Sequence, residues 1–143
     1  MEVRDAVESD AERLAAVGDA PTDVMRNLVH DRTVRVAVRE AGSAGPNADA
    51  ADDDGEAILG FVSFDARDRT VHVTQIAGTP AACERLLAEP VRFASGEGMA
   101  VELLVGEGDE TASEAAQAVG FERTGAGPQF DGRPTTRYRL DPN

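Results

Sequence analysis

The chain has 143 residues, with 14 Lys plus Arg against 27 Asp plus Glu, and a formal net charge of -13. All 14 basic residues are arginine. This length is typical of one domain, and the charge excludes two classes: nucleic-acid binders that act by neutralising phosphates, and polybasic membrane anchors. A lysine-free acidic composition is typical of halophilic proteins, because repulsion between carboxylates is screened within about 3 Å at 1 M salt. We therefore interpret the acidity as adaptation to salt, not as evidence of a cationic partner.

Other classes are excluded by single residue types. The one cysteine, Cys83, excludes an intrachain disulfide and a cysteine-based metal cluster. Only two histidines are present, so we expect no metal site. Residues 1–5 have neither the basic nor the apolar region of a signal peptide, and no apolar run approaches the ~18 residues of a membrane span. We expect a soluble, cytoplasmic protein.

The first half of the chain predicts two strands and two helices. In order they are a strand over 2–7, a helix over 11–17, a helix over 21–31 and a strand over 33–38. The first helix is expected to start at a capping box, with Ser9 as N-cap and Glu12 three residues later, and the helix over 111–119 at a second one, with Thr111 and Glu114. Residues 41–56 have no periodicity and contain only small, polar and acidic residues. We interpret them as a flexible acidic hairpin insertion within a single domain, 1–143.

The second half of the chain predicts five strands and two helices. Its strands are expected over 58–64, 69–76, 99–105, 121–125 and 135–140, and its helices over 80–95 and 111–119. Thr79 is a good N-cap before Pro80, whereas Pro90 predicts a kink or an early stop in the same helix. The order β-α-α-β-β-β-α-β-α-β-β indicates an α/β domain with a mixed sheet.

This element order resembles the GNAT N-acetyltransferase superfamily over nearly the whole chain. Residues 58–62 are similar to its hydrophobic-Gly-hydrophobic third strand, Leu86 and Leu87 to the paired leucines of its central helix, and residues 118–125 to its late Gly-Phe-Glu…Gly segment. The resemblance implies a GNAT-like domain that transfers an acetyl group from acetyl-CoA, as co-substrate, to an amine.

The family's cofactor loop has Gln or Arg, two residues, Gly, one residue, and Gly or Ala. Small residues there let backbone N–H groups at a helix N-terminus approach a pyrophosphate. Counting back from the paired leucines places this loop at 78–83, where the sequence departs from the pattern at several positions. The alternative is an ordinary capped helix start, with Cys83 as a core residue and not a nucleophile. The resemblance implies acetyl-CoA contacts at Val73, Gly78, Thr79, Ala81, Ala82 and Cys83.

Catalytic residues of the family transfer poorly to this sequence. The position of its proton-donating Tyr is Ala116 here, and the one tyrosine, Tyr138, is interpreted as structural. His72 is a candidate base because histidine side chains ordinarily exchange protons near neutral pH. Strict alternation would place it on one face with Thr70, Thr74 and Ile76. The alternative is a structural or surface histidine.

Three further features have open alternatives. Glu102 is a second candidate base if it faces the cleft, and otherwise a solvated charge. His30 ends the second helix near the acceptor pocket of the family, where it also suits a cation that balances the helix dipole. Residues 52–54 are three aspartates, which we interpret as a solvated loop and not as a cation site.

Two functions are carried forward. The first is an N-acetyltransferase acting on a small-molecule or peptide amine, whose splayed fourth and fifth strands admit the pantetheine arm and hold the thioester carbonyl by backbone N–H groups. The second is a GNAT-fold protein that has lost catalysis and serves as a ligand-binding or protein-interaction module. An edge strand near the C-terminus also permits a homodimer.

Overall fold

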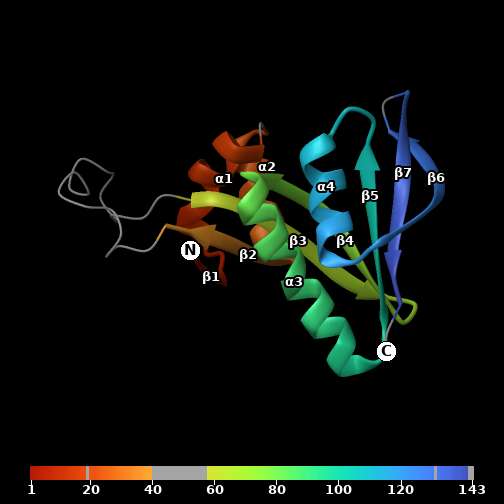
Figure 1. The fold of residues 1–143 in the computed structure, drawn as a ribbon. Coiled ribbons are helices and arrows are strands. Elements are labelled where there is room, and N and C mark those ends of the chain that lie inside the picture. The colour runs from red at the N-terminus through yellow and green to blue at the C-terminus, as the bar shows by residue number, and fades with distance from the viewer. Residues whose placement is uncertain (19, 40–57, 131, 142–143) are drawn as a thin grey trace.

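The computed structural model describes residues 1–18, 20–39, 58–130 and 132–141. Within these ranges the chain forms one mixed sheet in the order β1-β2-β3-β4-β5-β7-β6 (Figure 1). The strands are β1 (Glu2–Asp5), β2 (Thr33–Val38), β3 (Ile58–Arg67), β4 (Thr70–Gly78), β5 (Ala100–Gly106), β6 (Glu122–Phe130) and β7 (Arg133–Leu140). The helices are a short 3-10 turn (Glu8–Asp10), α1 (Ala11–Gly18), α2 (Thr22–Asp31), α3 (Pro80–Glu97) and α4 (Glu110–Val119).

The predicted element order and mixed α/β class are confirmed. Two local predictions are wrong. Helix α3 continues through Pro90 to Glu97 without the predicted early stop, and Pro90 is buried, so packing outweighs the lost backbone bond. Strand β3 runs on to Arg67, and the turn falls at Asp68 and Arg69, which both have positive φ. The insertion 41–56 and the aspartates at 52–54 lie outside the described residues.

Two helix starts also differ from the predicted capping boxes. At the first, the N-cap is Val7 and not Ser9, and Asp10, three residues later, accepts from Val7 N–H at 2.9 Å and from Arg4 and Arg13. At α4 the cap is Asp109, whose carboxylate accepts from Ala112 N–H at 3.1 Å. At α4 a carboxylate therefore replaces the predicted hydroxyl as N-cap acceptor, whereas at the first helix Asp10 acts as the acid that accepts from the N-cap N–H.

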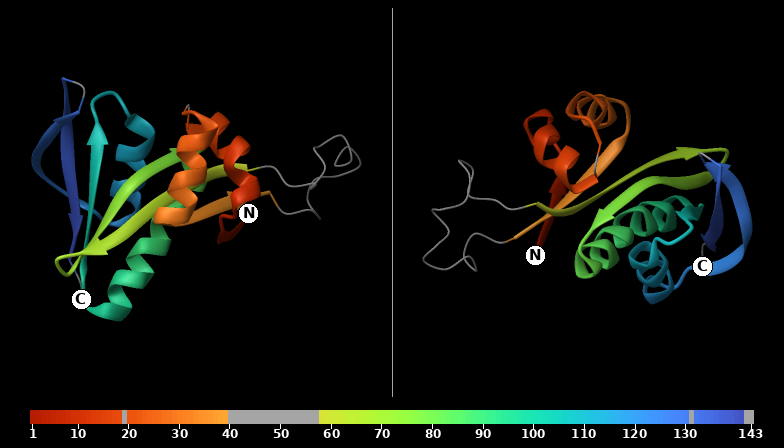
Figure 2. Two further views of the ribbon diagram at one scale, coloured as in Figure 1. Left: turned by 180° about the vertical axis from the view of Figure 1, so that it is seen from behind. Right: turned by 90° about the horizontal axis from the view of Figure 1, so that it is seen from above.

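The sheet separates two apolar cores (Figure 2). Helices α1 and α2 cover β2, β3 and the far end of β4, around Leu14, Met25 and Phe61. Helices α3 and α4 cover the opposite face, around Leu86 and Leu87. The face of β4, β5 and β7 that lies beyond α1 and α2 has no helix over it in the described structure, and it forms one wall of the site described below.

Strands β4 and β5 pair only over part of their length. Their parallel register runs from Thr70 opposite Ala100 to Val73 opposite Leu103, and beyond that point the strands separate. Thr74 is an extra residue in the pairing of β4 with β3, and its hydroxyl lies 2.5 Å from that of Ser63. The bulge reverses the alternation, so Ile76 packs into the α3-side core and does not share a face with His72 as predicted.

No helix within the described ranges is long and apolar enough to cross a membrane. The same part of the chain brings no three His, Cys, Asp or Glu side chains together as a metal site would require.

Candidate functional site

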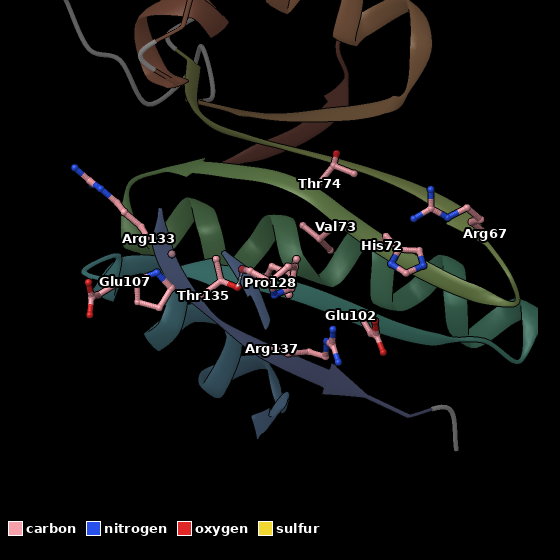
Figure 3. Close-up of a pocket in the computed structure, with 13 residues that line it drawn as sticks. Arg67, His72, Val73, Thr74, Glu102, Glu107, Pro128, Arg133, Thr135 and Arg137 are labelled. Atoms are coloured by element: carbon pink, nitrogen blue, oxygen red, sulfur yellow. Dashed lines mark hydrogen bonds between the residues drawn. The ribbon is translucent and has the colours of Figure 1, made fainter. Parts of the chain in front are cut away.

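A cleft of about 970 Å³ lies on the helix-free face of the sheet (Figure 3). It draws its walls from β3, β4, β5, β7 and the segments beside them. We call it the open-face cleft. Both candidate bases from the sequence, His72 and Glu102, line it. The other lining residues are Arg67, Val73, Thr74, Leu104, Gly106, Glu107, Pro128, Arg133, Pro134, Thr135 and Arg137.

His72 stands between two carboxylates in a row that crosses the sheet. It is in register with Asp65 on β3 and with Glu102 on β5. Each carboxylate already has an arginine: Arg32 pairs with Asp65, and Arg139 Nη1 donates to Glu102 Oε2 at 2.6 Å. No described side chain hydrogen bonds to the imidazole of His72. The imidazole is therefore the unengaged proton-exchanging group of this row, whereas Glu102 faces the cleft as an ion-paired acid.

A second, smaller cavity of about 200 Å³ occupies the gap where β4 and β5 separate. We call it the splay cavity. It reaches the N-terminal end of α4 at Asp109 and Ala112, and it shares Val73, Thr74 and Leu104 with the open-face cleft. Because pairing stops at Val73, backbone polar groups past that residue are available to a ligand. The splay cavity is lined from both faces of the sheet, by Gly18 and Phe61 on the α1 side and by Ala112 on the α4 side, and it borders the open-face cleft at the end of the β4–β5 ladder.

The start of α3 offers few donors to a phosphate. The hydroxyl of Thr79 accepts from Ala82 N–H at 3.1 Å, and its carbonyl accepts from Cys83 N–H at 2.9 Å. Thr79 N–H donates to Leu59 O at 3.0 Å, and Pro80 has no N–H. Of this first turn, Ala81 alone keeps an uncommitted backbone N–H. The residues fit a pantetheine arm in the splay cavity better than they fit a pyrophosphate at the helix start.

Cys83 belongs to the core under α3. Its side chain is 1% exposed, and Ala82 beside it is fully buried. Burial, and to a smaller extent the charge of Asp109, raise the pKa of the Cys83 thiol to about 11. A thiol that stays protonated is a poor nucleophile. At these two positions the side chains are buried and the backbone N–H groups already donate to Thr79, so neither is available to a cofactor.

No protein-family model and no curated protein matches this sequence. Solved structures do match. NAA60 of Arabidopsis thaliana, in complex with a bisubstrate analogue, has a TM-score of 0.73 at 16% identity, with 99% of this chain and 98% of that chain covered. The ribosomal-protein-alanine N-acetyltransferase of Brucella melitensis has a TM-score of 0.71 at 16% identity, with 99% of both chains covered. A Desulfovibrio desulfuricans protein assigned to the GNAT family of acetyltransferases has a TM-score of 0.67 at 19% identity, with 98% of both chains covered. The chain has the GNAT fold.

The resemblance implies a proton-donating tyrosine at position 116, but the alanine at that position and the one tyrosine of the chain, Tyr138, are both buried. Ala116 is fully buried in α4. Tyr138 is also buried, and its hydroxyl lies 2.6 Å from that of Ser113, on the α4 side of the sheet and away from the splay cavity. His30 lies outside the open-face cleft, where its Nε2 is 2.9 Å from Glu8 Oε2 and lowers the pKa of that carboxyl through a hydrogen bond.

Sequence reasoning missed several residues that line the open-face cleft. Arg137 alternates with the buried Tyr138 along β7, so its face was readable from the period of two. The position of Arg67 on a strand was missed because a turn was expected after residue 64, where β3 continues. The bulge at Thr74 has no local sequence signal, since it depends on how β4 pairs with β3.

Proposed function

We propose that the protein is an acyl-CoA-dependent N-acetyltransferase that transfers the acetyl group of acetyl-CoA to a small-molecule or peptide amine. One observation carries this proposal: the splay cavity and the open-face cleft are neighbours that share Val73, Thr74 and Leu104 as lining residues. A thioester held in the splay and an amine held in the cleft would meet there. The name of one similar structure, a ribosomal-protein-alanine N-acetyltransferase, and the assignment of another to the GNAT family of acetyltransferases support the same reaction. We place its work in the cytoplasm of a salt-adapted cell.

The chain's own groups would divide the chemistry as follows. His72 takes the proton that the amine loses as its nitrogen attacks the thioester carbonyl. The nitrogen–carbon bond forms, the carbon–sulfur bond breaks, and the sulfur leaves as a thiolate that is protonated by water. Backbone N–H groups past Val73 hold the carbonyl oxygen as negative charge develops on it. Holding the two reactants at one opening supplies much of the rate, so catalysis does not require a tyrosine.

The start of α3 favours a second candidate function. Pro80 has no N–H, and the N–H groups of Ala82 and Cys83 already donate to Thr79. The one free N–H, at Ala81, is a weak pyrophosphate site. Together with Ala116, this supports a GNAT-fold module that binds a ligand or a partner without transferring an acetyl group.

Calorimetric titration with acetyl-CoA in multi-molar KCl, followed by turnover over a panel of amines, separates the two functions. We expect binding and transfer. Leu104→Trp, which fills the opening shared by both spaces, should abolish transfer. Arg92→Gln is a matched control, because Arg92 lies on α3 with 75% of its side chain exposed. Absence of heat and of any thermal shift at millimolar acetyl-CoA would reject the enzyme, and binding without turnover would favour the module.

A further inference from the structure

The open-face cleft is rich in arginine although the chain is strongly acidic. Arg67, Arg133 and Arg137 line it beside two acids, Glu102 and Glu107. One of these acids, Glu102, is already neutralised by Arg139. On a chain of net charge -13, this face of the sheet therefore carries a local excess of positive charge.

Arg137 is the most informative of the three arginines. It projects from β7 opposite Leu104, the residue at the opening to the splay cavity. Figure 3 shows its side chain extending toward Glu102, yet the two form no ion pair. Its Nε is buried and has no hydrogen-bond partner among the described residues. A guanidinium cannot lose its proton, so this donor calls for an acceptor that the described chain does not supply.

Arg67 lies on the other side of the row that contains His72. It follows Asp65 by two residues on β3, which places both side chains on the same face of the sheet. Figure 3 shows Arg67 beside His72, whereas Arg133 points outward at the far end of the cleft. Two arginines thus flank the imidazole and the opening at which we place the amine.

We propose that the acceptor is a small primary amine that also carries a carboxylate, of the amino-acid class, and that Arg137 binds this carboxylate. The inference rests on the proposed function for the transfer step, but not for the binding. A guanidinium fork matches the two oxygens of a carboxylate with parallel hydrogen bonds. A cleft of about 970 Å³ lies within the range of small-molecule sites. In concentrated salt a distant charge is screened, so discrimination needs this direct contact.

The test measures binding of matched ligands by calorimetry in multi-molar KCl, with no acetyl-CoA present. The panel is glycine, alanine, aspartate, glutamate and phenylalanine, each beside its carboxamide and its decarboxylated amine. At least one free acid should bind roughly tenfold or more tightly than its carboxamide. Aminomethylphosphonate beside glycine distinguishes a phosphonate from a carboxylate as the preferred anion.

Variants assign the effect to Arg137. Arg137→Gln should weaken binding of the preferred acid roughly 10- to 100-fold and erase its advantage over the carboxamide. Arg137→Lys should recover part of that loss, Arg67→Gln should have a smaller effect, and Arg92→Gln on α3 should have none. Thermal melting of each variant shows whether it is folded.

Three results would overturn the inference: equal binding of acids and carboxamides, unchanged binding by folded Arg137→Gln, or no binding by any ligand of the panel. A separate titration with acetyl-CoA keeps the two proposals apart. Loss of donor binding with the carboxylate preference intact contradicts the transferase and leaves this site standing. Binding of acetyl-CoA and acetyl transfer without any carboxylate preference would support the transferase and contradict the carboxylate site.

Discussion

Gly60 and Gly78 face each other across β3 and β4 with no room for a side chain between the strands. A Cβ on Gly78 would overlap Gly60 Cα and the carbonyl oxygen of Leu59, and Gly78 has a φ of +135°. A Cβ on Gly60 would lie 2.7 Å from Ala77 O and 3.1 Å from Ala82 Cβ. This close approach brings the start of α3 against β3, which gives the glycine of the hydrophobic-Gly-hydrophobic strand a packing role.

Replacing Gly78 with alanine should therefore destabilise the fold. We expect Gly78→Ala to lower the free energy of unfolding by about 3 kcal/mol, because both the left-handed backbone and the contact with β3 oppose a Cβ. Denaturant titration measures this loss. The control is Gly96→Ala in α3, where a Cβ meets nothing within 4 Å and should stabilise the helix by about 0.5–1 kcal/mol. Equal stabilities of the two variants would contradict the packing role.

How much of this arrangement was predictable depends on how local its cause is. Thr79 and Pro80 were predicted as a helix start because capping chemistry acts within one turn. Pro90 was misjudged because the packing of α3, which holds it in the helix, comes from distant strands. The bulge at Thr74 depends on how β4 pairs with β3, and the position of Arg137 opposite Leu104 depends on how β7 pairs with β5. Neither pairing can be predicted from a local window of sequence.

His72 should matter more to transfer than any other titratable side chain of the cleft. His72→Ala is expected to lower kcat by about 10²- to 10⁴-fold, because its imidazole is the unengaged base beside the splay. Glu102→Gln should have a smaller effect, since Glu102 is already held by Arg139. The matched control is His30→Ala on α2, which removes the exposed contact between His30 and Glu8. Single-turnover rates measure all three, and near-native turnover by His72→Ala would remove His72 from the mechanism.

Asp10 should link stability to pH at the acid end. Burial alone would raise the pKa of Asp10, but hydrogen bonds from Arg4 and Val7 N–H and the charges of Arg4 and Arg13 bring it below its ordinary value of 3.8. The stabilisation is therefore complete above that value and is lost as pH falls through the lower, folded pKa. Asp10→Asn should cost about 2 kcal/mol near neutral pH.

Denaturant titrations of wild type and Asp10→Asn across the acid range provide the check. The difference in their free energies of unfolding should shrink as pH falls below about 4, because a protonated Asp10 resembles asparagine. Asp31→Asn, at an exposed position ending α2, should stay within about 0.5 kcal/mol of wild type at every pH. A difference for Asp10→Asn that persists unchanged into acid would show that its charge is not what stabilises the turn.

The Cys83 thiol should be unreactive in the folded protein. It is 1% exposed and its pKa is raised to about 11, so almost no thiolate is present at pH 8. Ellman's reagent should label it only after denaturation, and Cys83→Ala should retain transfer activity within a factor of about two. Rapid stoichiometric labelling of the native chain would instead place the thiol at an accessible, activated site.

Restoring a backbone donor at the start of α3 should strengthen acetyl-CoA binding. Pro80→Ala adds one N–H beside that of Ala81 while Thr79 keeps its cap, and a hydrogen bond to a phosphate of that kind is worth roughly three- to tenfold in Kd. Pro90→Ala, in the same helix but about three turns further on, is the control and should leave Kd unchanged. Calorimetric titration of both variants decides the point. Tighter binding by Pro80→Ala alone would locate the phosphates at this helix start, and equal Kd values would mean that the donor's phosphates bind elsewhere, with the splay cavity carrying its affinity.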